Sequence, residues 1–162
     1  CKFEDIIKLL VINMEQSMIN DIVREHLSDS PLPSDLMKLC VSYLVEVKKE
    51  YYSSGGIASE VSYVNDKKHG LYKWWGSNGQ LESETPYVNG ERDGVCKMWH
   101  PNGQLSHEIP FSNDERNGLC KTWYPNGQLQ SDTLYCDDER YGVRKWWYEN
   151  GDLRCKTLFK KK

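Results

Sequence analysis

The stretch "TWYPNGQLQSD" covers Thr122 to Asp132, and a near copy, "MWHPNGQLSHE", covers Met98 to Glu108. Glycines and Asn-Gly pairs keep the same step of 24 residues, at Gly70, Gly94, Gly118 and Gly142 and at Asn78-Gly79, Asn102-Gly103, Asn126-Gly127 and Asn150-Gly151. An aromatic column with this step adds an earlier copy that begins near Glu46 and lacks the leading glycine: Tyr63, Tyr87, Phe111, Tyr135 and Phe159. A fixed period of roughly 20 to 50 residues is typical of stacked arrays whose units contact mainly their neighbours. The sequence therefore predicts five repeats.

Each repeat has the pattern of a β-hairpin. Its two halves are rich in aromatic and β-branched residues and are separated by a Pro-Asn-Gly or similar turn. Pro125 suits the first central position of a type I turn, Asn126 the second, and Gly127 the left-handed residue of a G1 bulge. A second turn, Asn89 to Gly94, leads into the next repeat. We therefore predict a mainly β fold, a meander of five 24-residue hairpins that forms an elongated single-layer sheet over residues 46–162.

The register of the hairpin decides which face is buried, and two patterns conflict. With a three-residue turn, Trp99 lies opposite Leu105, and Val95, Ile109 and Phe111 share their face. With a two-residue turn, lysines instead lie opposite acids, Lys73, Lys97 and Lys121 facing Glu84, Glu108 and Asp132. Such a pair contributes a few tenths to about 1 kcal/mol, whereas burial of a large aromatic contributes about 1.5 to 3 kcal/mol. We therefore expect the three-residue turn and two buried columns, Trp75, Trp99, Trp123 and Trp147 beside Ile57, Leu81, Leu105, Leu129 and Leu153.

Residues 1–45 differ in pattern from the repeats. Apolar residues recur at helical spacing from Phe3 to Leu27, and Ser34 is placed to cap a further helix. The first sheet edge of an array needs a cover. We predict α-helices that cap the repeats, with a docking element for another protein as the alternative.

Composition excludes several classes of partner. The net charge is −3, which gives no field that attracts nucleic acid or an anionic membrane. The six cysteines include no C-x-x-C pair, which indicates reduced thiols. No apolar run approaches the roughly 20 residues of a membrane span, and the N-terminus lacks the pattern of a secretion signal. We expect a protein of the cytoplasm that is neither secreted nor transmembrane, with Cys1 or Met14 near the natural start.

The sequence shows no set of groups that indicates catalysis. The four histidines are scattered, and there is no phosphate-binding glycine loop and no paired nucleophile and base. His100 stands in a column otherwise occupied by Tyr124 and Tyr148, which favours a surface ring. Zinc ligation by Cys96, His100 and Cys120 fits the strand geometry poorly. We predict a non-enzymatic protein without a cofactor or bound metal.

Two sets of residues are candidates for binding a protein partner. Trp74 and Trp146 adjoin the tryptophan column and should point to the opposite face, where an exposed Trp is a plausible anchor. Arginines of the Glu-Arg pairs, Arg92, Arg116 and Arg140, recur along one edge, either as solvated turns or as a periodic ladder for an extended partner.

The columns described above, including Gly118, Trp123 to Gly127, Leu129 and Tyr135, resemble MORN repeats. The resemblance covers the region from Glu46 onward and is to the variant found in bacterial antitoxin-like proteins and in many large DNA virus proteins. It implies an elongated, gently curved sheet of hairpins that serves as a protein-binding or scaffolding surface, with lipid binding proposed for some members. It also implies two narrower alternatives, a minor capsid or virion-associated structural component and an antitoxin-like neutralising protein.

A second stretch, "LPSDLMKLCVSYL" from Leu32 to Leu44, is similar to the opening of an F-box. This similarity implies a substrate adaptor of a ubiquitin ligase that docks through Leu32, Pro33, Leu36, Leu39 and Leu44. An F-box continues through further helices, whereas this chain enters its first repeat at Glu46.

Overall fold

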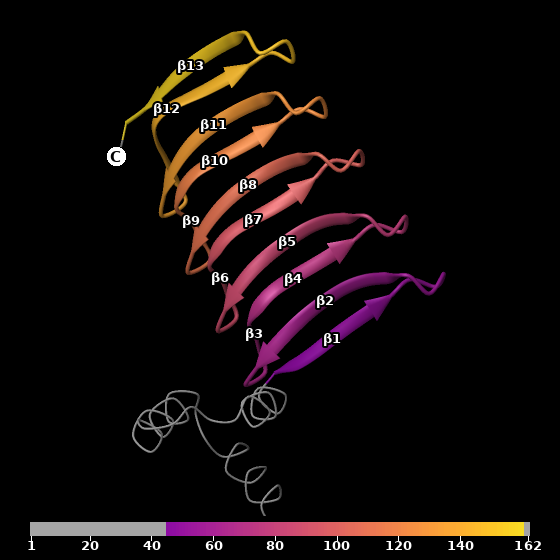
Figure 1. Cartoon of the computed structure of the whole chain (residues 1–162). Coiled ribbons are helices and arrows are strands. Elements are labelled where there is room, and N and C mark those ends of the chain that lie inside the picture. Colours follow the sequence, from indigo (N-terminus) through magenta and orange to yellow (C-terminus); the bar gives the residue numbers. More distant parts are fainter. Residues whose placement is uncertain (1–44, 161–162) are drawn as a thin grey trace, which may run out of the picture. The chain divides into compact units, whose positions relative to one another are not determined.

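The computed structural model describes residues 45–160, and these form one antiparallel sheet of thirteen strands. Its hairpins follow one another across the sheet in chain order, from β1 to β13 (Figure 1). The predicted N-terminal helices and the docking residues Leu32, Pro33, Leu36, Leu39 and Leu44 lie outside the described residues. Within the described residues, no helix has the length and apolar character to cross a membrane.

Ten of the strands form the five predicted hairpins. They are β1 (Glu46–Tyr51) with β2 (Ile57–Val64), β4 (Gly70–Trp75) with β5 (Leu81–Val88), β7 (Gly94–Trp99) with β8 (Leu105–Ser112), β10 (Gly118–Trp123) with β11 (Leu129–Cys136), and β12 (Glu139–Trp147) with β13 (Leu153–Phe159). Three two-residue strands, β3 (Lys67–Lys68), β6 (Glu91–Arg92) and β9 (Glu115–Arg116), pair with the ends of β2, β5 and β8. The mainly β meander of five repeats is therefore confirmed.

The turn within each hairpin has the predicted chemistry. The Gly103 N–H donates to the His100 carbonyl at 2.8 Å, and the φ of Gly103 is 83°. The His100 N–H donates to the Gln104 carbonyl at 2.8 Å, which closes a three-residue loop. This combination is a type I turn followed by a G1 bulge, in which glycine takes the positive φ without steric cost.

The turn between repeats is a tight two-residue hairpin. Asn113 and Asp114 both have positive φ, 49° and 66°, as a type I′ turn requires. After such a turn the chain enters the next long strand at a glycine with positive φ. One of these glycines is Gly94, at the start of β7, with a φ of 110°. A Cβ atom on Gly94 would lie 2.8 Å from Pro86 Cγ, and one on Gly118 2.9 Å from Pro110 Cγ. Positive φ therefore explains the glycine column, and lack of space adds to it at these two positions.

Both sequence patterns for the register coexist in the hairpins. In the third repeat, Trp99 lies opposite Leu105, and Lys97 also lies opposite Glu108. A β-bulge between Met98 and Trp99 leaves Ser106 as an extra residue, which shifts the pairing by one. The same shift recurs in β4/β5, β10/β11 and β12/β13. The three-residue turn is thus confirmed, and it does not exclude the lysine–acid pairs.

The bulge makes part of the predicted face assignment wrong. Val95 lies opposite Pro110, whereas Ile109 lies opposite Cys96 and Phe111 opposite Gly94. Because neighbouring residues on a strand point to opposite faces, Val95 does not share a face with Ile109 and Phe111. Beyond the bulge, the alternation of the side chains is displaced by one residue.

The tryptophan and leucine columns are not buried as predicted. Trp75, Trp99, Trp123 and Trp147 are half-buried, and Leu153 is exposed. Among the described residues, no large side chain is fully buried. A single sheet has no second layer of strands or helices to cover a face, so its side chains are shielded mainly by their neighbours in the same face.

Candidate functional site

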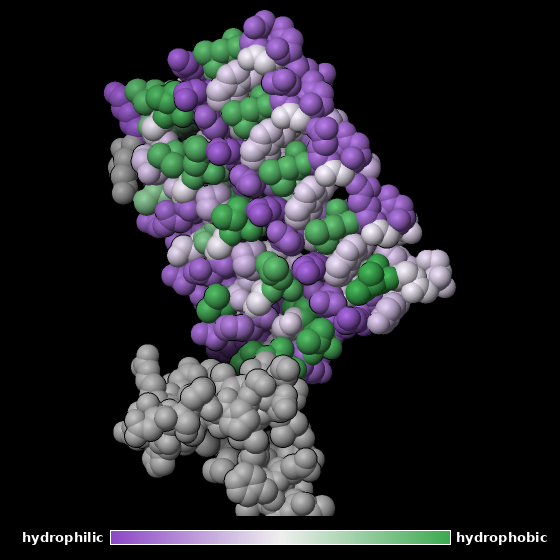
Figure 2. Space-filling view, in the orientation of Figure 1, coloured by the Kyte–Doolittle hydropathy of each residue, from purple (hydrophilic) through white to green (hydrophobic). Residues whose placement is uncertain are grey.

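The two faces of the sheet carry different side chains. We call the face of Lys97 and Glu108 the ladder face and the face of Cys96 and Phe111 the aromatic face. Figure 2 shows one side of the array, on which hydrophobic residues gather in columns that cross the strands and alternate with hydrophilic ones. The surface is therefore organised by the repeat rather than as one central site.

Opposite charges alternate across the ladder face. The order, from β1 to β12, is Lys49, Glu60, Lys73, Glu84, Lys97, Glu108, Lys121, Asp132 and Lys145. Three of these neighbours approach as ion pairs, with N–O distances of 2.9 Å for Lys49–Glu60 and 3.8 Å for Lys97–Glu84 and Lys145–Asp132. Opposed charges on neighbouring strands contribute about 0.2 to 1 kcal/mol each. We call this row the charge ladder; it favours the observed register between neighbouring repeats.

A row of exposed aliphatic residues runs beside the charge ladder. Each lies two residues before a ladder lysine and therefore on the same face. Their exposed fractions are 42–49%, and the row consists of Val47, Leu71, Val95, Leu119 and Val143. We call these five residues the aliphatic stripe. Three of them are opposed on the next strand by Pro86, Pro110 and Leu134, and Val143 by the exposed Leu158.

Sequence reasoning missed the aliphatic stripe, although its 24-residue step is visible in the sequence. Val95 was expected on a buried face because of its apolar side chain. Val95 does lie on the face of Trp99, which is the ladder face, but nothing among the described residues covers it. A contiguous row of exposed apolar side chains marks a contact surface more often than scattered ones do.

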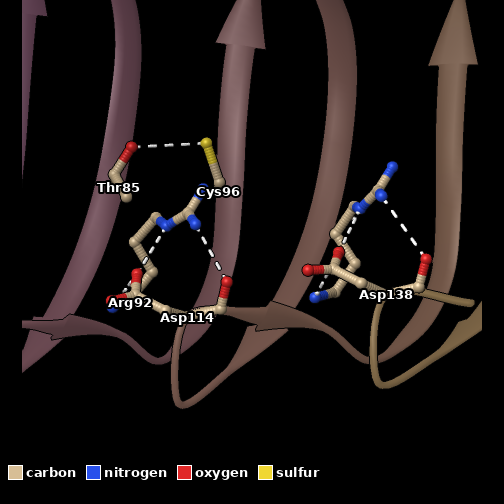
Figure 3. A network of polar contacts seen from close by, with 6 residues as sticks. Thr85, Arg92, Cys96, Asp114 and Asp138 are labelled. Carbon is tan, nitrogen blue, oxygen red and sulfur yellow. Dashed lines mark hydrogen bonds and ion pairs between the residues drawn. The ribbon is translucent and has the colours of Figure 1, made fainter.

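Arginines of the tight turns hold neighbouring repeats together. Arg92 Nε donates to Asp114 Oδ1 at 2.7 Å, and the Arg92 N–H donates to the same oxygen at 3.0 Å. Arg116 makes the same contacts with Asp138, at 2.5 Å and 3.1 Å (Figure 3). The bonds to Arg92 lower the pKa of Asp114, and those to Arg116 lower the pKa of Asp138. We call these two contacts the arginine clamps.

Each clamp also stacks on the aromatic column. The guanidinium of Arg92 lies 4.1 Å from the ring centre of Phe111, and that of Arg116 lies 4.2 Å from Tyr135. Both distances are within the range of a cation–π contact. Lys68, which stands in the same column, faces Gly90 instead of an aspartate and stacks on Tyr87 at 5.1 Å. Clamp residues therefore serve the junction between repeats on the aromatic face.

The predicted partner-binding arginines are thus not alike. Arg92 and Arg116 are held in clamps and are half-buried. Arg140 is exposed, and its Nε donates to the Tyr135 hydroxyl at 3.0 Å. Of the three, Arg140 presents the most accessible guanidinium to a partner.

Trp74 and Trp146 lie on the aromatic face, opposite to the Trp75 column, but they are half-buried rather than exposed. The Trp74 ring meets Tyr52 edge to face, with 6.5 Å between ring centres. The Trp146 ring lies under Arg144 at 4.4 Å. Both rings are therefore already engaged with neighbours in the sheet.

A hollow of about 220 Å³ opens on the aromatic face of the last hairpin. It is lined by Arg144, Trp146, Cys155 and Thr157. Arg144 Nε and Trp146 Nε1 are buried and have no hydrogen-bond partner among the described residues. Buried N–H groups are normally paired, so these two donors mark a place for an acceptor.

The histidine in the tyrosine column has a structural contact. His100 Nε2 lies 2.8 Å from the Trp123 carbonyl, where the Tyr124 hydroxyl donates to the Trp147 carbonyl at 2.9 Å in the next repeat. Because a carbonyl only accepts, His100 carries its proton on Nε2. The surface-ring interpretation of His100 agrees with this geometry.

Burial shifts the pKa of one thiol and of one histidine. Burial raises the pKa of Cys120, the opposite of what a reactive thiolate requires. Burial also lowers the pKa of His107, which stays neutral near pH 7. Cys96, Cys120, Cys136 and Cys155 are free, and no group of three or more metal-ligating side chains comes together in residues 45–160.

Comparison with known families agrees with the repeat pattern. The family model described as a MORN repeat variant matches residues 47–65, 68–89, 92–113, 116–137 and 140–161, more than half of the chain. MORN repeats are generally non-catalytic modules that mediate protein or membrane interactions. No curated protein matches the chain.

Proposed function

Because the chain belongs to the MORN repeat variant family, we propose that it is a non-enzymatic scaffold that binds another protein through its ladder face. The observation that carries this proposal is the aliphatic stripe, five exposed apolar side chains in one row across five repeats. A periodic surface of this kind suits a partner that extends along the array. The aromatic face is the second candidate surface, through Trp74, Trp146 and Arg140.

The size of the apolar contact supports a binding role. Burying a Val or Leu side chain completely contributes about 1.5 to 3 kcal/mol. Since nearly half of each stripe residue is exposed, covering the stripe would contribute about 1 kcal/mol per residue and about 5 kcal/mol in all. Association has an entropic cost of about 4 kcal/mol or more. The stripe therefore provides recognition, and contacts with the neighbouring charge ladder add to it.

The spacing of the stripe favours a helical partner. Strands lie about 4.8 Å apart, so residues of successive hairpins are about 10 Å apart. Seven residues of an α-helix rise about 10.5 Å. An amphipathic helix that lies across the strands would place an apolar side chain against each stripe residue at every seventh position, with charged residues toward the charge ladder.

The experiment is affinity capture from cells of the source organism with matched surface variants. Leu71→Ser combined with Leu119→Ser removes the second and fourth residues of the stripe. Met98→Ser is the control on the aromatic face, where Met98 is also exposed. Proteins retained by the wild type and by Met98→Ser, but lost from the stripe variant with an unchanged unfolding midpoint, are the expected result. If the stripe variant keeps them and Trp74→Ala with Trp146→Ala loses them, the contact surface is the aromatic face.

The narrower roles implied by the resemblances stay predictions. No observation on residues 45–160 bears on a virion component, on an antitoxin-like protein, or on a ubiquitin-ligase adaptor that uses Leu32 to Leu44. Mass spectrometry of purified virus particles tests the role as a virion component. Co-purification with the ligase adaptor tests the role as a ubiquitin-ligase adaptor.

A further inference from the structure

We propose that β13 binds an acidic peptide segment as an added antiparallel strand, with a carboxylate opposite Lys156. This site is an edge of the sheet rather than the aliphatic stripe. The inference therefore goes beyond the proposed function, and it names a partner by its charge.

The charge ladder breaks at β13. At every earlier step a lysine lies opposite an acid, as Lys121 does with both Glu108 and Asp132. At the last step Lys145 lies opposite Lys156. The whole of β13, Leu153 to Phe159, contains Arg154 and Lys156 and no acidic residue. An acid on a further strand would restore the alternation at the point where it fails.

The backbone of β13 is available for such a strand. In the order of strands, β13 is last and pairs with β12 alone among the described residues. Six of its seven residues are exposed. A strand with one unpaired edge presents a row of N–H and C=O groups to which an extended segment can bond.

The register of the added strand follows from the junctions within the array. Glu84 lies opposite Lys97 and Asp132 opposite Lys145, each pair joining the second strand of one repeat to the first strand of the next. Lys156 occupies the position of Glu84 and Asp132. A strand that continues the array therefore places one residue directly opposite Lys156, on the ladder face, where an acid is favoured and a lysine is repelled.

A second observation lies on the other face of the same hairpin. The hollow is lined by Arg144, Trp146, Cys155 and Thr157. Two of these residues have a buried donor without a partner among the described residues, Arg144 Nε and Trp146 Nε1. Residues next to the one opposite Lys156 would point to this face, because side chains alternate along a strand. An acceptor side chain at one of these positions, such as a Glu, would lie on the same face as the hollow. Both faces of the last hairpin thus favour an acidic strand.

Edge lysines also have a different role, since they discourage the pairing of sheet edges. In that role the lysines serve only to keep other strands away from the edge. It predicts that neither an acidic nor a basic strand binds to β13. The acidic-strand proposal predicts binding that depends on the residue opposite Lys156, which makes the two readings separable.

The test uses the full chain and two labelled peptides in a fluorescence anisotropy titration. Both copy Glu139 to Glu149, the sequence that would continue the array, and one carries Lys145→Glu. The acidic peptide should bind about five- to thirtyfold more tightly than the lysine peptide, which corresponds to replacing cross-strand repulsion with attraction. In Lys156→Glu protein the preference should reverse. Lys160→Glu, which changes net charge equally at an exposed position beyond β13, should leave it unchanged.

Three results would each overturn the proposal: no binding of either peptide up to about 1 mM, equal affinity for both, or a preference that Lys156→Glu does not reverse. The Leu71→Ser and Leu119→Ser variant separates this inference from the proposed function. It should bind the acidic peptide as the wild type does, whatever happens to the partner of the ladder face.

Discussion

Substitution of Gly94 by alanine should destabilise the array more than the same change at Gly79. Both glycines have positive φ, 110° and 79°. At Gly79 nothing lies within 4 Å of the added Cβ, whereas at Gly94 that atom would lie 2.8 Å from Pro86 Cγ. The two positions therefore separate backbone strain from steric contact between neighbouring strands.

The expected magnitudes follow from these two effects. A left-handed conformation costs a residue with a Cβ about 1 to 2 kcal/mol, which is the whole effect at Gly79. Overpacking adds about 1 to 3 kcal/mol, since the proline ring is rigid and belongs to the preceding repeat. Gly94→Ala should thus lower the free energy of unfolding by about 2 to 5 kcal/mol. With a urea slope of about 1 to 3 kcal/mol/M, the midpoint should fall by about 1 M or more.

The assay is urea unfolding followed by tryptophan fluorescence, with Pro86→Ala as the partner in a double-mutant cycle. Pro86→Ala removes Cγ, so it should recover part of the stability lost in Gly94→Ala and none of that lost in Gly79→Ala. Equal destabilisation at both glycines, or no coupling between Gly94 and Pro86, would refute the proposed packing of the junction.

Three further predictions concern the clamps, the tyrosine column and the charge ladder. Asp114 and Asp138 have a lowered pKa in the folded state, so their stabilisation is present above the ordinary value of 3.8 and is lost as pH falls through the folded value. The urea midpoint of the wild type should therefore decrease when the pH is lowered below about 4. The decrease should be smaller in the double variant Asp114→Asn with Asp138→Asn. His100→Ala should lose about 0.5 to 1.5 kcal/mol with the bond to the Trp123 carbonyl, whereas His100→Tyr should retain that stability in the same assay. Lys121→Glu, placed between Glu108 and Asp132, should lower the thermal midpoint, while Lys156→Glu, placed opposite Lys145, should raise it; shifts of the same sign would contradict the ladder.

The number of hairpins and the form of their turns follow from local chemistry and were predicted. Pro125, Asn126 and Gly127 each suit one position of a single turn type, and the 24-residue step repeats it five times. These features need no knowledge of distant contacts. The structure confirms the turn, the strand order and the opposition of Trp99 and Leu105.

The bulge left no pattern to recognise. Its extra residue is of a different type in each repeat, Glu82, Ser106, Gln130 and Arg154. In a hairpin without a bulge, the pairing of Trp99 with Leu105 and the pairing of Lys97 with Glu108 exclude each other. Only the tryptophan pairing was therefore expected from the sequence. The consequence was that Ile109 and Phe111 were placed on the face of Val95 and Trp99. That face was also expected to be buried, so the aliphatic stripe was missed.

The clamps and the exposed stripe depend on contacts between repeats. Arg92 and Asp114 are 22 residues apart, a step visible in the sequence, but Glu91 beside Arg92 favoured the interpretation of a solvated turn. Apolar residues in a strand usually indicate a covered face. Within residues 45–160 a single layer leaves the ladder face open, and that openness is a property of the assembled sheet rather than of any one segment.

A comparison of two thiol alkylation rates tests the assignment of the faces most directly. One is the rate at Cys96 in the wild type, and the other is the rate at position 95 in Val95→Cys with Cys96→Ser. Peptide mass spectrometry resolves each thiol, and the rates in denaturant correct for intrinsic reactivity. Val95 is exposed on the ladder face and Cys96 is buried on the aromatic face, so alkylation should be fast at position 95 and strongly protected at position 96. Equal rates, or protection at position 95 with rapid alkylation at Cys96, would contradict the assignment of the two faces and the aliphatic stripe that depends on it.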